Sequence, residues 1–132
     1  MAGLRWTSAL AVGVPEIDRQ HSHLLDLMAR LHDLVVGGGD RAVLSAVMEE
    51  LERYTEFHFA TEERLMDAHG YEDADDHKDE HSLMLDDIHR CCDEYILASN
   101  NPKPVLAYLE HWFVQHIHEV DRALGKALNA AD

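Results

Sequence analysis

His58 and Glu62 stand four residues apart in the chain, and so do His77 and His81. On an α-helix this spacing places both members of a pair on one face, one turn apart. Imidazole nitrogens and carboxylate oxygens are common ligands of transition metals, so each pair is suited to bind one metal site. One such pair is a weak signal in a chain with eleven histidines, but two pairs together indicate a metal centre.

A third pair, His116 and Asp121, has a spacing of five residues. On an ideal α-helix these two side chains would point about 140° apart. If both contribute to the same centre, the helix must bend, widen locally into a π turn, or end near His118. The sequence therefore predicts one of these distortions at that place.

Four amphipathic stretches are available to position these side chains. Apolar residues recur in them at helical spacing, and no part of the chain shows the alternation typical of a strand. The predicted helices span residues 18–36, 41–69, 75–99 and 104–128. Because the connections between them are short, consecutive helices are expected to run antiparallel. We therefore expect an all-α fold, an antiparallel up-down-up-down four-helix bundle with an irregular N-terminal arm.

The boundaries of these helices are predicted from capping residues, glycines and prolines. Asp18 and Asp40 are the expected caps at the starts of the first and second helices. Gly70 is expected to end the second helix, and Pro104 fits the first turn of the last one. Asn100 and Asn101, with the following proline, are expected to end the third helix.

Each predicted helix carries a histidine or a carboxylate within its apolar stripe, where an unpaired polar group would cost several kcal/mol. For a single buried histidine, a hydrogen bond to a neighbour is the simplest explanation. Four helices with the same feature indicate a shared ligand. With His21, which lies on the apolar stripe of the first helix, the chain offers five imidazoles and two carboxylates. These are too many for one tetrahedral zinc, and mixed nitrogen and oxygen donors suit redox-active iron.

Composition excludes several other classes of protein. A length of 132 residues fits a single domain, residues 1–132. Twenty-six acidic residues against eleven basic ones give a net charge of -15, which disfavours binding to nucleic acids. No apolar segment is long enough for membrane insertion. Cys91 and Cys92 are adjacent, which suits neither a mutual disulfide nor a shared metal, so a reducing cytoplasm is the expected location.

These features together resemble the bacterial hemerythrins over nearly the whole chain. The matching motifs, in the order and spacing of that family, are Trp6 with Val-Gly-Val-Pro, Ile-Asp-Arg-Gln-His ending at His21, His58-x-x-x-Glu62, His77-x-x-x-His81 and His116-x-x-x-x-Asp121. The resemblance implies a non-haem di-iron centre inside the bundle. One iron would be bound by His77, His81 and His116, and the other by His21 and His58.

The resemblance also implies that Glu62 and Asp121 each bridge the two irons, together with an oxo or hydroxo group. The second iron would then keep an open position, at which dioxygen binds reversibly. The expected function is that of an oxygen carrier, store or delivery protein, not of an enzyme. In this family the gating side chain of the oxygen pocket corresponds to Phe113, and Trp112 lies on the same helix face. Both aromatics fit an ordinary core equally well.

Two other functions compete with this interpretation. A ferritin-like di-iron oxidase or peroxidase would carry Glu-x-x-His motifs on two helices, and this chain contains none. A sensor of oxygen or nitric oxide that acts through a separate partner remains open. No attached signalling domain is expected, because the chain ends soon after the fourth helix. The acidic run from Glu72 to Asp76 lacks the central glycine of a calcium loop.

Overall fold

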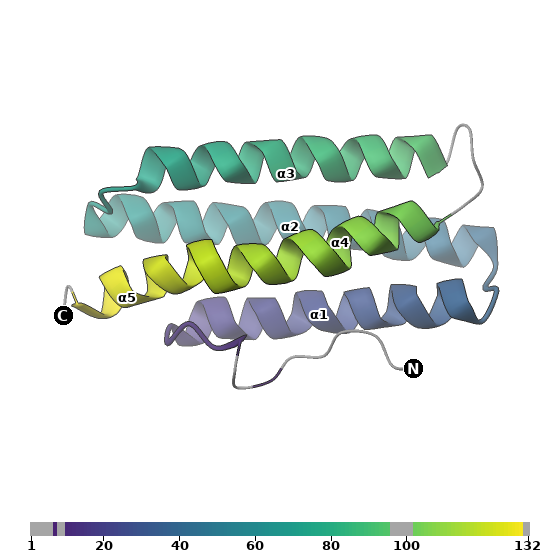
Figure 1. Cartoon of the computed structure of the whole chain (residues 1–132), viewed down its shortest axis with the longest axis horizontal. Coiled ribbons are helices and arrows are strands. Elements are labelled where there is room, and N and C mark those ends of the chain that lie inside the picture. Colours follow the sequence, from purple (N-terminus) through teal and green to yellow (C-terminus); the bar gives the residue numbers. More distant parts are fainter. Residues whose placement is uncertain (1–6, 8–9, 96–101, 131–132) are drawn as a thin grey trace.

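The computed structural model describes residues 7, 10–95 and 102–130. Its helices are α1 (Pro15–Val36), α2 (Arg41–His69), α3 (Ala74–Glu94), α4 (Lys103–His116), the π-helical turn η3 (Ile117–Asp121) and α5 (Arg122–Ala130). The last three follow one another directly and form the fourth arm of the bundle (Figure 1). The described residues contain no strand. The predicted all-α four-helix bundle is confirmed.

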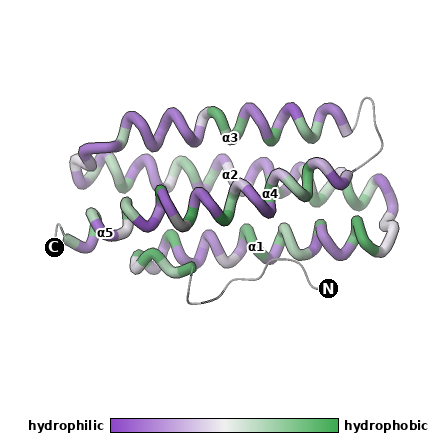
Figure 2. Tube along the Cα trace, viewed as in Figure 1, coloured by the Kyte–Doolittle hydropathy of each residue, from purple (hydrophilic) through white to green (hydrophobic). Residues whose placement is uncertain are grey.

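The helices form a square arrangement. Helix α1 packs against α2 and α4, and α3 packs against the same two helices. Consecutive helices run in opposite directions (Figure 1). Hydrophobic and hydrophilic segments alternate along each of them (Figure 2), as amphipathic helices require. The described helices include none that is long and apolar enough to cross a membrane.

The core consists of buried aliphatic side chains and methionines from all four arms. It includes Leu24, Leu25, Met28, Met48, Met66, Met84, Leu109 and Leu124. Burying each such side chain stabilises the fold by about 1.5–3 kcal/mol. The polar side chains of the candidate centre lie inside this apolar bundle, so water does not compete for them.

The start of α1 corrects one prediction. The helix begins at Pro15 and not after Asp18, because proline fits the first helical position, where no backbone donor is needed. The Asp18 carboxylate instead accepts a hydrogen bond from the backbone N–H of Val12, at 2.8 Å. It thereby ties the segment before the helix to α1. Trp6 of the expected arm lies outside the described residues.

Helix α2 has the ends that its flanking residues predict. The side chain of Asp40 accepts a hydrogen bond from the backbone N–H of Ala42. Gly70 has a φ of 62°, a left-handed conformation that glycine adopts readily at a helix end. Pro104 lies in the first turn of α4, as expected. The predicted break at Asn100 and Asn101 falls outside the described residues.

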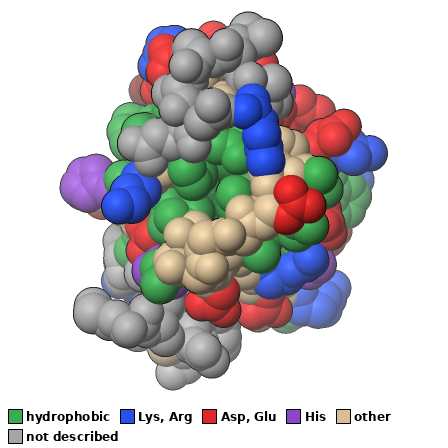
Figure 3. Space-filling model, turned by 90° about the vertical axis from the view of Figure 1, so that its right-hand side faces the viewer, with side chains coloured by type: hydrophobic (Ala, Val, Ile, Leu, Met, Phe, Trp, Pro, Cys, Tyr) green, Lys and Arg blue, Asp and Glu red, His purple; other side chains and the backbone are tan. Residues whose placement is uncertain are grey.

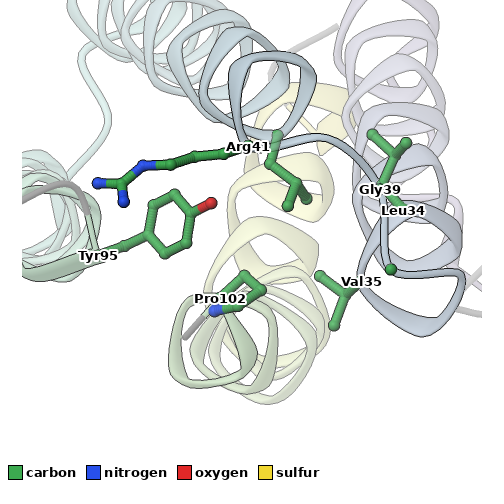
Figure 4. A pocket seen from close by; sticks show the side chains of 8 residues that line it. Leu34, Val35, Gly39, Arg41, Tyr95 and Pro102 are labelled. Carbon is green, nitrogen blue, oxygen red and sulfur yellow. The ribbon is translucent and has the colours of Figure 1, made fainter. Parts of the chain in front are cut away.

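One end of the bundle, where α1 meets α2, has a hollow of about 480 Å³. Hydrophobic side chains lie in the middle of this face, with charged side chains around them (Figure 3). The labelled residues that line the hollow are Leu34, Val35, Gly39, Arg41, Tyr95 and Pro102 (Figure 4). The Arg41 guanidinium lies 5.5 Å from the centre of the Tyr95 ring. None of the predicted site residues lines this hollow.

Candidate metal centre

The seven predicted ligands come from all four arms but lie in one half of the bundle. In antiparallel helices, the beginning of α1 and α3 lies beside the end of α2 and α4 (Figure 1). All seven side chains are buried, each 2% exposed or less: His21, His58, Glu62, His77, His81, His116 and Asp121. The fold therefore places residues that are up to 100 positions apart in one apolar interior.

Helix geometry changes where the sequence predicts a distortion. The π-helical turn η3 covers Ile117–Asp121, directly after His116. A π turn closes hydrogen bonds between residues five apart, so it brings such residues to the same side of the helix. The Nε2 atom of His116 lies 3.1 Å from Oδ1 of Asp121. The predicted distortion is confirmed, and of the three forms considered it is the π turn.

The side chains form two groups that share both carboxylates. The ligand atoms within each group lie within 4.8 Å of one another. One group offers five donors, from Glu62, His77, His81, His116 and Asp121. The other offers four, from His21, His58, Glu62 and Asp121. This grouping has the form expected for two adjacent cation positions with two shared ligands.

Glu62 divides its two oxygens between the groups. Its Oε2 atom lies 2.9 Å from Nε2 of His58 and 3.4 Å from Nε2 of His21. Its Oε1 atom lies 3.2 Å from Nε2 of His77 and 3.1 Å from Nε2 of His81. One carboxylate thus faces both groups, one oxygen to each.

Asp121 repeats this arrangement from the opposite helix. Its Oδ2 atom lies 2.9 Å from Nε2 of His21. Its Oδ1 atom lies 3.0 Å from Nε2 of His77 and 3.1 Å from Nε2 of His116. Both carboxylates are therefore oriented as bridging ligands would be.

Many of these atoms have short contacts but no hydrogen bond. Among the described residues, the buried atoms without a hydrogen-bond partner include Nε2 of His21, His58, His81 and His116, both oxygens of Glu62 and Oδ2 of Asp121. A buried polar atom without a partner costs about 1–3 kcal/mol. The ligand atoms of each group lie close enough together for a single cation, at a point between them, to contact them all. A bound cation at that point satisfies them, so the donor set fits a metal centre.

Without a cation, protons take its place on two histidines. Burial lowers the pKa of His21, but the contacts with Asp121 and Glu62 outweigh it and raise that pKa to about 9. The same balance of burial against these two carboxylates raises the pKa of His77 to about 9. Both imidazoles are therefore protonated on both nitrogens and positively charged at neutral pH when no metal is bound.

The two carboxylates stay ionised for the corresponding reason. Burial raises the pKa of Glu62, but the charge of His58 and the contact with His21 outweigh it and hold that pKa well below its usual range. Burial and the charge of Glu62 raise the pKa of Asp121, but His116 and His21 outweigh them and lower it. Both carboxylates therefore keep their negative charge and remain available to a cation.

The metal-free protein should lose stability as the pH rises from about 6.5 to 9. Because folding raises the pKa of His21 and His77, their contribution to stability is full below the unfolded pKa of 6.5 and disappears as the pH passes about 9. Urea unfolding in the presence of a chelator, at pH 6.5, 8 and 9.5, measures this loss. The zinc-loaded protein is the control, because metal-bound rings carry no proton at Nε2. A free energy of unfolding that is constant or rises over this range would contradict the assignment.

Three histidines have partners at the other ring nitrogen. The Nδ1 atom of His58 lies 2.7 Å from the side-chain oxygen of Gln20, whose amide donates to the hydroxyl of Thr61. Gln20 was not among the site residues predicted from the sequence. It occupies the buried stripe of α1, four residues before Leu24, and a polar residue on that stripe was a usable signal.

Carboxylates contact the other two rings. The Nδ1 atom of His81 lies 3.1 Å from Oε2 of Glu63, and that of His116 lies 2.9 Å from Oε1 of Glu80. Such outer contacts fix the orientation of a ligand imidazole and increase its basicity. The sequence alone held no signal for Glu63 and Glu80, because they are two of twenty-six acidic residues.

Aromatic side chains enclose the centre. The ring of Phe113 lies 6.0 Å from that of His21, and the ring of Phe59 stacks on His81 at 3.8 Å. Both phenylalanines are buried. Trp112 is half-buried and stacks on Tyr108. Phe59 was missed in the sequence analysis, although its position directly after His58 places it at the same level of the bundle.

Other histidines of the described residues have other partners. His23 is exposed and its ring lies 4.3 Å from that of Tyr54. Nδ1 of His89 on α3 lies 2.8 Å from Oε2 of Glu52 on α2. Neither of the two candidate groups includes these residues.

The fold and the site define a class of protein: a four-helix bundle with a buried metal centre of histidines and carboxylates. Residues 12–128 match the family model described as hemerythrin HHE cation binding domain. The chain therefore belongs to the hemerythrin family, and within it to the bacterial type.

Individual relatives agree with this assignment. The chain is 32% identical over 121 residues to a bacteriohemerythrin of Pseudomonas aeruginosa, an overlap of 92% of this chain and 78% of the relative. It is 30% identical to the bacteriohemerythrin of Methylococcus capsulatus, over 98% of this chain and 100% of the relative. A crystal structure of wild-type hemerythrin superposes with a TM-score of 0.86 at 29% identity, and covers 95% of this chain and 97% of its own.

Proposed function

We propose that this protein binds dioxygen reversibly at a pair of iron ions, as an oxygen carrier, store or delivery protein. One observation carries the proposal: two groups of buried donors share the two carboxylates Glu62 and Asp121. The relatives are bacteriohemerythrins, which agrees with it.

The proposed ligands follow the two groups. His77, His81 and His116 would hold one iron, and His21 and His58 the other. A mixed set of imidazole and carboxylate donors suits redox-active iron, whereas structural zinc sites prefer four ligands in a tetrahedron. When bound, a pair of ferrous ions supplies the two electrons that reversible binding of dioxygen requires.

The group with fewer donors is the proposed place for dioxygen. It has four donors and the other has five, so a position remains for a small ligand on the side of His21. Phe113 lies against His21 on that side and is 2% exposed. An apolar, buried wall there excludes water and free protons from the ligand.

The negative charges of the two buried carboxylates also support the binding of two divalent cations. Two cations close together in a poorly polarisable interior repel each other strongly, and ionised carboxylates offset that repulsion. Glu62 and Asp121 remain ionised in the buried centre. The bridging positions are the places where their charge acts on both cations at once.

We also propose that the protein works in the cytoplasm. Its two cysteines, Cys91 and Cys92, are both free. Free thiols persist in a reducing compartment. The net charge of -15 disfavours nucleic acids as partners.

Oxygen uptake tests the proposed function. The reduced, iron-loaded protein should take up about one dioxygen per pair of irons in an oxygen electrode and release it under argon over several cycles. Continued consumption of oxygen with an added reductant would instead indicate a di-iron oxidase. Uptake without release would also count against a carrier.

Replacing Phe113 with alanine should both destabilise the protein and speed its irreversible oxidation in air. Removing a buried aromatic side chain costs about 3–5 kcal/mol, and the space it leaves beside His21 admits water. Loss of the oxygenated visible spectrum with time measures the oxidation rate. Trp112→Ala is the comparison, because Trp112 contacts Tyr108 and is half-buried. An equal or larger acceleration in the Trp112 variant would show that Trp112 and not Phe113 guards the centre.

A further inference from the structure

We propose that the centre fills in a fixed order: the first divalent cation binds at His77, His81 and His116, and the second at His21 and His58. Glu63 and Glu80 are the positioning residues that set this order through the rings they contact. The inference rests on the proposed two-metal function. It adds an unequal affinity of the two positions and names the residues that cause it.

The first reason is the number of donors. Both groups include Glu62 and Asp121, so the shared carboxylates give neither position an advantage. The five-donor group has three imidazoles and the four-donor group has two. A first cation therefore gains one more ligand in the five-donor group.

The second reason is the charge behind the imidazoles. With Nε2 directed at the centre, the proton of each ring lies on Nδ1. Three of the five rings, those of His58, His81 and His116, donate it to a side chain, whereas Nδ1 of His21 and of His77 has no partner. In the five-donor group, His81 donates to Glu63 and His116 to Glu80, which are carboxylates. In the four-donor group, His58 donates to the neutral amide oxygen of Gln20. Hydrogen bonds to charged acceptors make an imidazole the stronger donor to a metal, so the five-donor group binds more tightly.

The third reason is access for a cation. A hollow of about 290 Å³ between α3 and the segment around Val120 is lined by Asp73, Asp76, Glu80 and His77. A cleft with carboxylates on its walls concentrates cations. His77 belongs to the five-donor group, and neither His21 nor His58 lines this hollow. The hollow therefore concentrates cations beside the five-donor group.

The second cation must bind more weakly. It shares both carboxylates with an ion already present, and two cations a few ångströms apart repel each other. Loading should therefore occur in two resolved steps, and the first step belongs to the five-donor group.

Calorimetric titration of the metal-free protein with cobalt(II) under argon tests this order. The wild type should bind two ions in two steps. Each of Glu63→Gln and Glu80→Gln should weaken the first step by about 10–100-fold, the usual effect of removing such an outer contact, and should change the second step much less. Glu52→Gln is the matched control. It alters a contact of the same kind, between Glu52 and the non-ligand His89, and should change neither step.

A pair of ligand variants tests the order independently of the glutamates. His58→Gln should keep the first step and lose the second, whereas His81→Gln should lose the tight first step. Circular dichroism shows whether each variant is folded. If a histidine variant does not fold, the titrations of Glu63→Gln and Glu80→Gln test the order. Loss of the first step in His58→Gln, or equal weakening of both steps in Glu63→Gln and Glu80→Gln, would overturn the proposed order. Binding of a single ion by the wild type would instead overturn the two-metal function itself.

Discussion

Replacing Glu62 with glutamine should reduce the metal content of the iron-loaded protein from two ions per chain to one or fewer. The Oε1 and Oε2 atoms of Glu62 face different groups of histidines, so this one side chain acts on both positions. Glutamine has a similar shape but no charge, and its nitrogen cannot bind a cation. The affinity for the second ion should fall by more than the roughly 10–100-fold that the loss of an outer contact causes. Elemental analysis after gel filtration gives the number of ions.

Glu56→Gln is the matched control for that experiment. Glu56 lies on the same helix, is exposed, and contacts His89 instead of the centre. The control should retain two ions per chain. If Glu62→Gln also retained two ions with unchanged affinity, Glu62 would not be a bridging ligand and the proposed centre would be wrong.

Binding of metal should stabilise the protein by about 4 kcal/mol when the free metal concentration is 1,000 times its Kd. The reason is that seven buried polar side chains satisfy one another poorly until a cation lies between them. For a chain of this size the gain corresponds to a rise in Tm of at least about 10 °C. Thermal unfolding with and without zinc(II), which has no redox chemistry, measures it. An unchanged Tm at saturating zinc would contradict a metal site in the core.

Loading should also release protons, which separates the buried centre from adventitious surface binding. At pH 7 the rings of His21 and His77 are protonated in the metal-free protein, because their pKa values are about 9. A cation displaces both protons when it binds. A pH indicator in weakly buffered solution detects them.

Asp121→Asn, which removes a proposed shared ligand, should gain less stability from zinc than the wild type.

Much of the fold could be predicted from the sequence because its signals are local. Helix α2 spans Arg41–His69, the range expected, since a capping aspartate and a left-handed glycine mark its two ends. The start of α1 was predicted wrongly. Aspartate is a common capping residue, but the helix begins at Pro15. The Asp18 carboxylate instead accepts a hydrogen bond from the backbone N–H of Val12. The sequence does not show which of several suitable residues meets a donor.

The predicted ligands could be identified from the sequence more fully than the residues that contact them. Six of the seven predicted ligands occur in pairs four or five residues apart, which puts them on defined helix faces, and the π turn after His116 follows from the same geometry. The seventh, His21, was predicted from its place on the apolar stripe of the first helix and from the family resemblance. The outer contacts could not be found in this way. Glu80 meets His116, 36 positions away, only because α3 and α4 pack side by side. Such pairs depend on how the helices rotate and slide against each other, which no local pattern specifies.

An anomalous difference map at the iron absorption edge, from crystals of the iron-loaded protein, tests the central claim most directly. We predict two peaks inside the bundle. One should lie among His77, His81 and His116 and the other beside His21 and His58, with Glu62 and Asp121 between them. A single peak, or iron bound away from these side chains, would contradict the account.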